Sequence, residues 1–144
     1  MTEQRYLGVD HGTRRMGLAV GALPLQVATP LAVVPAQPEA AAIERIVAAA
    51  REYDVAAVVV GLPLNMDDTV GPQAKLALEM VKQLRLQLEM PVRTWDERLS
   101  SFAADQALAG QYTRKQKKAR QDAVAAAEML SEFLAAVVEG REEP

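Results

Sequence analysis

Several residue types that commonly carry enzyme chemistry are absent or rare in this sequence. It has no cysteine, one histidine and one tryptophan among 144 residues. The absence of cysteine excludes a disulfide framework, a thiolate zinc site and a cysteine nucleophile. His11 is the only histidine that could act as a general base, so serine-hydrolase chemistry is also disfavoured.

Long hydrophobic runs and an excess of positive charge are also missing. The longest nearly uncharged apolar run, residues 55–64, has about half of the roughly 20 residues that a membrane-spanning helix requires. Asp10 interrupts the first apolar stretch before a signal-peptide core can form, so we expect a cytoplasmic protein without a membrane partner. Because the net charge is −3, a polyanion must be contacted by local groups of basic residues.

The residues that are present are typical of a folded α/β protein. Half of them are hydrophobic, and the length suits one domain spanning residues 1–144. Short apolar runs predict strands, and runs with helical spacing predict helices. The predicted strands are residues 6–9, 16–20, 31–34, 58–60 and 92–95, and the predicted helices are residues 39–53, 74–88, 101–109 and 120–138.

The order of these elements predicts the architecture. The polar turn at residues 10–13 and the short connections among the first three strands indicate an antiparallel meander, whereas later strands alternate with helices. The consecutive valines at residues 58–60 favour a central strand that is covered on both faces. We therefore expect a five-stranded mixed sheet, antiparallel for the first three strands and parallel for the remainder, with helices on both faces.

Three acidic residues stand at positions suited to chemistry. Asp10 ends the first predicted strand, Glu97 follows the last one, and Asp122 lies near the start of the final helix. Ligands often bind beyond strand ends in α/β sheets, and carboxylates suit Mg²⁺ or Mn²⁺. Each acid also has a structural explanation: a turn aspartate, a solvated loop acid, and an acid that favours a helix N-terminus. The spacing of the acids does not show that they converge.

Glycines surround the first of these acids. We expect Gly8, Gly12 and Gly17 to let an anion or a second strand approach the backbone closely.

Four segments, taken together, resemble the YqgF/RuvX family in its own order along the chain. They are GVDHGTRRMGLA at residues 8–19, VGLPLNMD at 60–67, DERLS at 96–100 and DAVAA at 122–126. The resemblance implies a ribonuclease H-like fold and a divalent-metal-dependent nuclease with two ions held by Asp10, Glu97 and Asp122. Family members are described as nucleases that mature the 5′ end of pre-16S ribosomal RNA and as Holliday junction resolvases.

Two positions differ from the pattern of the family. His11 stands where an apolar or aromatic residue is usual, and Asp68 replaces a glycine. We interpret His11 as a strand-end residue that points away from the site; the alternative is an additional ligand or proton shuttle. Asp68 still suits a turn, because aspartate tolerates positive φ better than most residues.

Basic and amide side chains near the acids are candidates for contact with nucleic acid. Arginine and lysine bind phosphates, and an amide can contact a phosphate or a base edge. Alternatively, the basic residues form a solvated charge run and Asn65 shapes a turn. The candidates are Arg14, Arg15, Asn65, Arg98, Arg114, Lys115, Lys117, Lys118 and Arg120.

Other functions compete with the nuclease hypothesis. Residues 10–13 also resemble a phosphate loop of sugar-kinase and heat-shock ATPases, but those enzymes bind ATP between two domains and this chain has room for one. A non-catalytic nucleic-acid-binding module is a second alternative. Among nuclease substrates, pre-16S RNA is preferred over four-way junctions and general DNA or RNA. Junction cleavage needs a dimer. Three apolar residues lie off the main apolar face of their helix and suit a dimer interface: Leu76, Met80 and Leu86. The sequence is compatible with both a monomer and a homodimer.

Overall fold

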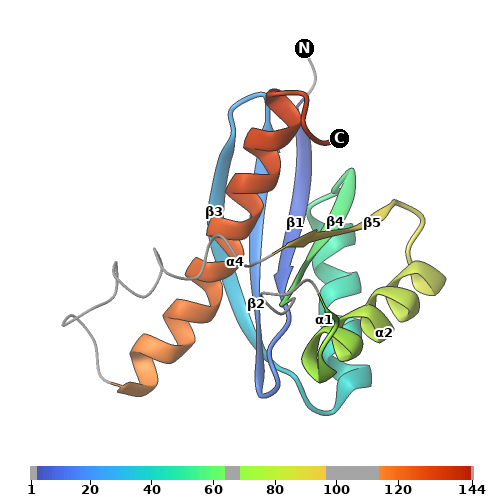
Figure 1. The fold of residues 1–144 in the computed structure, drawn as a ribbon, viewed down its shortest axis with the longest axis vertical. Helices are drawn as coiled ribbons and strands as arrows, with labels where there is room; N and C mark the ends of the chain where they lie inside the picture. Colours follow the sequence, from blue (N-terminus) through green and yellow to red (C-terminus); the bar gives the residue numbers. More distant parts are fainter. Residues whose placement is uncertain (1–2, 64–68, 97–113, 144) are drawn as a thin grey trace.

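The protein is built around one mixed sheet. The computed structural model describes residues 3–63, 69–96 and 114–143, with the backbone alone described for residues 114–122 (Figure 1). The strand order is β3-β2-β1-β4-β5. These strands are β1 (Gln4–Asp10), β2 (Arg15–Leu23), β3 (Val27–Pro35), β4 (Ala57–Leu62) and β5 (Val92–Asp96). The pairs β1–β2 and β2–β3 are antiparallel, whereas β1–β4 and β4–β5 are parallel, so the predicted mixed sheet is confirmed.

The first three strands are longer than the apolar runs that predicted them. Pro30 lies inside β3, and the pairing of β2 with β3 shifts at Leu18/Ala19, opposite that proline. A proline has no N–H to donate, and it is tolerated here because β3 is an edge strand. The predicted start at residue 31 was therefore wrong: β3 begins at Val27 and continues through Pro30.

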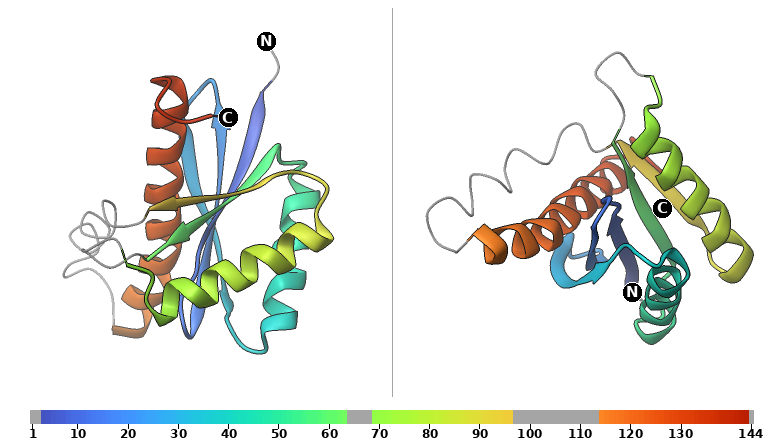
Figure 2. Two further views of the ribbon diagram at one scale, coloured as in Figure 1. Left: turned by 45° about the vertical axis from the view of Figure 1, so that its right-hand side comes forward. Right: turned by 90° about the horizontal axis from the view of Figure 1, so that it is seen from below.

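Helices cover both faces of the sheet, as predicted. Figure 2 shows α1 (Glu39–Glu52) and α2 (Pro72–Gln87) on one face and α4 (Arg114–Val138) on the other. The last helix begins six residues before the predicted residue 120, because the intervening lysine, arginine, glutamine and alanine residues all favour helix. The helix predicted at residues 101–109 lies outside the described residues.

Alternation along the strands divides the buried side chains between two cores. Leu7, Val9 and Val58 pack with α1 and α2, whereas Tyr6 and Val59 pack against α4. This division confirms that β4 is covered on both faces. Among the described helices, none is long and apolar enough to cross a membrane.

Some sequence-based assignments of helix faces were wrong. Met80 is fully buried, so the proposed interface keeps only Leu76 and Leu86 as exposed residues. The predicted helix 120–138 ends as expected at Val138, but this apolar residue is 53% exposed. Helical periodicity located the buried stripes, but it could not tell where the neighbouring elements stop covering them.

Candidate active site

The carboxyl ends of the three parallel strands form one edge of the sheet. β1 ends at Asp10, which pairs with Gly61 of β4, and Leu62 of β4 pairs with Asp96, the last residue of β5. Strands in a sheet are roughly 5 Å apart, so the first and third of these strand ends are separated by about 10 Å. This edge therefore holds Asp10 and Asp96, the residue that precedes Glu97 in the sequence.

The face to which Asp10 belongs follows from its neighbours along β1. Tyr6 packs in the core beside α4, and Gly8 lies against the same helix. Because residues two apart in a strand share a face, Asp10 lies on the α4 face of the sheet. Its carboxylate is partly exposed at the end of the strand.

The packing of α4 against the glycines sets the position of this helix along the sheet. A Cβ atom built on Gly8 would lie 3.0 Å from Leu130 Cβ and 3.3 Å from the Ala126 carbonyl oxygen. A Cβ atom on Gly21, which pairs near the start of β1, would lie 2.8 Å from Leu134 Cδ1. Therefore α4 runs antiparallel to β1, and its earlier residues lie closer to the carboxyl edge.

The same packing relates position 122 of α4 to Asp10. Position 122 precedes Ala126 by four residues, about 6 Å along a helix, and Asp10 follows Gly8 by two residues, about 7 Å along a strand. The helix backbone at position 122 thus comes level with Asp10 on the same face of the sheet. The side chain of Asp122 lies outside the described part of the chain.

The close approach at Gly8 is a correction to the sequence analysis. An anion or a second strand was expected near this glycine, but the backbone of α4 occupies that space. Gly12 has a different function, because a Cβ there would lie 2.3 Å from the Arg15 carbonyl oxygen within the β1–β2 turn. The lack of a side chain at both glycines therefore allows close packing next to Asp10: of α4 at Gly8 and of the chain at Arg15 at Gly12.

The remaining predicted residues fall into three groups. Arg14 is exposed in the β1–β2 turn, and Arg15, the first residue of β2, is partly buried. Both lie beside the carboxyl end of β1. Residues 114–120, which we call the basic segment, form the first turns of α4, with their backbone alone described. The predictions for Asn65, Glu97, Arg98 and Asp68 lie outside the described residues.

His11 lies on the side of the sheet opposite Asp10. Its side chain is 8% exposed and lines a cavity of about 70 Å³ together with Glu39 and Leu76. Burial lowers the pKa of the imidazole, an effect that the nearby Glu39 opposes. Within the described residues Nδ1 has no hydrogen-bond partner. This placement agrees with the structural interpretation of His11 rather than with a ligand of the predicted site.

Asp96 is the residue at this edge that the sequence analysis did not select. Thr94 lines a groove beside α2, whereas Trp95 packs edge-on to Phe133 of α4, with ring centroids 5.7 Å apart. Alternation then assigns Asp96 to the α2 face, opposite Asp10. The signal was available in the strand pattern, but it could be used only once the core contacts of β5 were known.

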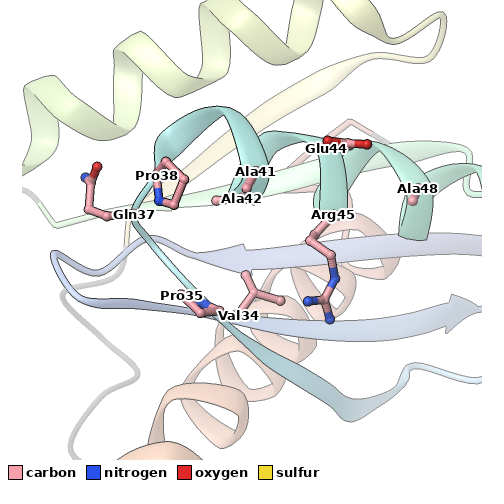
Figure 3. A pocket seen from close by; sticks show the side chains of 9 residues that line it. All are labelled: Val34, Pro35, Gln37, Pro38, Ala41, Ala42, Glu44, Arg45 and Ala48. Atoms are coloured by element: carbon pink, nitrogen blue, oxygen red, sulfur yellow. The ribbon is translucent and has the colours of Figure 1, made fainter.

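A larger cavity lies away from this edge. It has a volume of about 450 Å³ between the end of β3 and α1, and Figure 3 shows its mainly small and apolar lining with Glu44 and Arg45. None of the predicted site residues lines it. This larger cavity is therefore separate from the carboxyl edge of the sheet, where Asp10 and Asp96 lie.

The donor set at the edge fits a hard divalent cation. Asp10 offers carboxylate oxygens, which Mg²⁺ and Mn²⁺ prefer, and His11, the adjacent alternative donor, is buried on the other face. The described side chains contain no group of three acids or histidines that could hold a metal. Among the predicted ligands, Asp10 is therefore the one whose side chain the structure describes.

Comparisons with known structures define the class of protein. The structure of Thermus thermophilus RuvC in complex with Holliday junction substrate matches with a TM-score of 0.59 and 21% identity, covering 96% of this chain and 97% of that chain. The fowlpox virus Holliday junction resolvase matches with a TM-score of 0.55 and 13% identity, covering 92% and 99%. The chain thus has the ribonuclease H-like α/β fold of these resolvases.

The relatives in sequence then define the family. The family model described as "RuvX: Holliday junction resolvase" matches residues 4–136. Proteins from Roseiflexus sp. (strain RS-1) and Anaeromyxobacter sp. (strain K), each named "Putative pre-16S rRNA nuclease", are 39% and 43% identical over 131 residues. The alignments cover 90% of this chain and 93% and 96% of those proteins. The chain belongs to the RuvX family, and it is a hydrolytic nuclease of a class that uses divalent metals.

Proposed function

We propose that the carboxyl edge of the sheet is the nuclease site, with Asp10, Glu97 and Asp122 as the carboxylates that hold two Mg²⁺ or Mn²⁺ ions. The observation that carries this proposal is the seating of α4 on Gly8, which brings the backbone at position 122 level with Asp10. β5 ends at the same edge at Asp96, the residue that precedes Glu97 in the sequence. Asp10, the residue that precedes Glu97 and the backbone at position 122 are thus brought to one edge of the sheet.

The chemistry assigned to this site is phosphodiester hydrolysis. Two divalent ions, when bound, would supply an activated water near neutral pH and positive charge for the leaving oxygen. The contribution of the protein is to hold acidic oxygens at fixed positions. Asp10 is fixed by pairing on both sides of β1, and α4 is fixed by its buried contacts with the sheet.

Around these acids, basic and amide side chains would orient the substrate. Arg14 lies in the turn that follows β1 and Arg15 begins β2, whereas the basic segment begins the helix that contains position 122. Asn65 and Arg98 lie in sequence just after β4 and β5, strands whose carboxyl ends form this edge. Arginine can make bidentate contacts with phosphate, so these positions suit the backbone on either side of the scissile bond.

As the substrate we propose pre-16S ribosomal RNA, cut at its 5′ end during ribosome biogenesis in the cytoplasm by residues 1–144 acting as one domain. The names of the relatives at about 40% identity support this choice. A four-way DNA junction is the second candidate, favoured by the description of the family model. Junction cleavage requires two sites acting together, so it would need a homodimer, whereas RNA processing allows a monomer.

The experiment that tests the site compares wild type with Asp10→Asn on labelled pre-16S RNA, single-stranded DNA and a four-way junction. We expect wild type to cut in Mg²⁺ or Mn²⁺ and not in EDTA, and Asp10→Asn to lose cutting while keeping its unfolding transition. Glu97→Gln and Asp122→Asn should behave like Asp10→Asn. Asp96→Asn is the matched control, because it removes a carboxylate from the other face of the same edge and should retain most of the activity. Full activity in all three site variants would refute the assignment.

A further inference from the structure

A groove with a basic lining lies between α2 and the edge strand β5. We call it the α2–β5 groove; its volume is about 430 Å³. Its lining holds three basic side chains and one acidic side chain, in a protein whose net charge is −3. The lining residues are Lys75, Leu78, Glu79, Val81, Lys82, Arg85 and Thr94. None of them belongs to the site proposed above or to the basic segment.

The basic residues follow one side of α2 away from the carboxyl edge. Lys75 lies in the first turn of the helix, which begins at the carboxyl edge, and Arg85 lies in its last turns. Arg85 Nη2 donates a hydrogen bond of 2.7 Å to the carbonyl oxygen of Val92, at the start of β5. At 1.5 Å per residue, the row from Lys75 to Arg85 is about 15 Å long. The row therefore begins at the nuclease edge and runs back along the sheet.

The electrostatics of α2 favour an anion at the start of this row. The first turn contains no acidic residue, and Gly71, the N-cap, provides no side-chain hydrogen bond. Lys75 stands in that turn, where the helix dipole opposes a positive charge and attracts a negative one. A bound phosphate would neutralise the lysine and interact favourably with the dipole of the helix.

The rest of the row is also available to a ligand. Lys82 Nζ lies 3.4 Å from Glu79 Oε1, and both side chains are more than 60% exposed. Such a pair is weak and screened by salt, so it does not prevent Lys82 from contacting a phosphate. Thr94 adds a hydroxyl from β5 on the opposite wall.

We propose that the α2–β5 groove binds the sugar-phosphate backbone of the nucleic acid at a distance from the cut, with Lys75, Lys82 and Arg85 as phosphate contacts. The inference rests on the proposed function, because the ligand is the substrate of the nuclease site. In one strand of a duplex, charges repeat every 3.4 Å along the axis, so a row of about 15 Å spans roughly four nucleotides. The groove would thus set how far the substrate must extend beyond the scissile bond.

The test measures binding of fluorescently labelled single-stranded RNA as a function of salt, in an Asp10→Asn background that prevents cutting. The groove variant carries Lys75→Gln, Lys82→Gln and Arg85→Gln. Removing one phosphate-binding charge lowers the slope of log K against log salt by about 0.7 on a single strand, so we expect the slope to fall by about 2. Glu79→Gln should have the opposite effect and tighten binding, because it removes the one acidic side chain of the lining.

A charge-matched control separates the groove from the net charge of the protein. Arg5, Arg45 and Arg141 are exposed and lie outside the groove, so replacing all three with glutamine removes the same charge. We expect this control to keep the slope of the background protein. If the control lowers the slope as much as the groove variant does, or if the groove variant binds as the background does, the proposal is overturned.

Two further measurements keep the result interpretable. Because Arg85 holds α2 to β5, the variant with Lys75→Gln and Lys82→Gln alone preserves that bond, and its slope should still fall by about 1.4. Activity measured with Asp10 intact distinguishes the two proposals: unchanged RNA binding by the groove variants overturns the groove but leaves the nuclease site standing. If the Asp10→Asn background protein does not bind RNA, the groove proposal is overturned. The nuclease site is judged separately, by whether wild type cuts RNA and the Asp10→Asn protein does not.

Discussion

Replacing Gly8 with alanine tests how closely α4 is seated on the sheet. The new methyl group would lie 3.0 Å from Leu130 Cβ and 3.3 Å from the Ala126 carbonyl oxygen, both shorter than ordinary contact. Neither atom is the flexible end of a side chain, and Leu130 is fully buried. The helix must therefore move away from β1 by a few tenths of an ångström.

The expected cost follows from two opposing effects. Overpacking a core costs about 1–3 kcal/mol, and replacing glycine reduces the conformational freedom of the unfolded chain by about 0.4–1 kcal/mol in the opposite direction. We expect Gly8→Ala to lower the free energy of unfolding by about 1–2 kcal/mol. For a chain of this length the corresponding decrease in Tm is about 3–8 °C.

The same displacement has a consequence for activity. Ala126 precedes Leu130 by one turn and follows position 122 by one turn, so a shift there changes the spacing between Asp122 and Asp10. Gly21→Ala is the matched control, because its methyl group would meet the side-chain ends Leu134 Cδ1 and Leu130 Cδ2 and, at 3.1 Å, the Val27 carbonyl oxygen, all farther from the site.

The assay combines urea unfolding with cleavage rates measured where both variants are folded. We expect Gly8→Ala to lose cleavage rate beyond its loss of folded protein, whereas Gly21→Ala should lose stability without a comparable loss of rate. A Gly8→Ala variant as stable and as active as wild type would show that α4 is not seated as described, and the geometric argument for Asp122 would fail with it.

Three further predictions concern other parts of the structure. Phe133→Ala should cost about 3–5 kcal/mol in urea unfolding, because the ring is fully buried and packs against Tyr6 and Trp95; Phe133→Leu should cost much less, and equal costs would contradict the packing argument. Burial, assisted by Glu128, raises the pKa of Glu132, so its contribution to stability is present below the unfolded pKa of about 4.5 and is lost as pH rises through the folded pKa. The change in Tm caused by Glu132→Gln should therefore be more favourable at pH 7 than at pH 4. If the variant has the same pH dependence of Tm as wild type, the pKa of Glu132 is not raised. Neutralising the three lysines of the basic segment should flatten the salt dependence of duplex binding by roughly 0.9 in slope for every phosphate that they bind, and an unchanged slope would mean that these lysines face solvent alone.

Local patterns in the sequence were sufficient for most of the fold. Apolar runs located all five strands, and helical spacing located α1 and α2 within about two residues. These signals are local because the strand and helix periods are properties of the backbone itself. The boundaries failed where a long-range contact decided them, as at Pro30, which an edge strand accepts.

The candidate site depended on both kinds of information. The sequence by itself placed Asp10 at a strand end and, through the resemblance to the RuvX family, named Glu97 and Asp122 beside it. Only the tertiary structure decided the strand order, in which β4 lies between β1 and β5. It also decided that α4 crosses Gly8 at Ala126 and Leu130, and that Lys75 and Arg85 line a groove with β5. These facts depend on pairing register and on contacts between residues far apart in the chain. Such contacts are set by how two surfaces fit together, and a short stretch of sequence contains only one of the two surfaces.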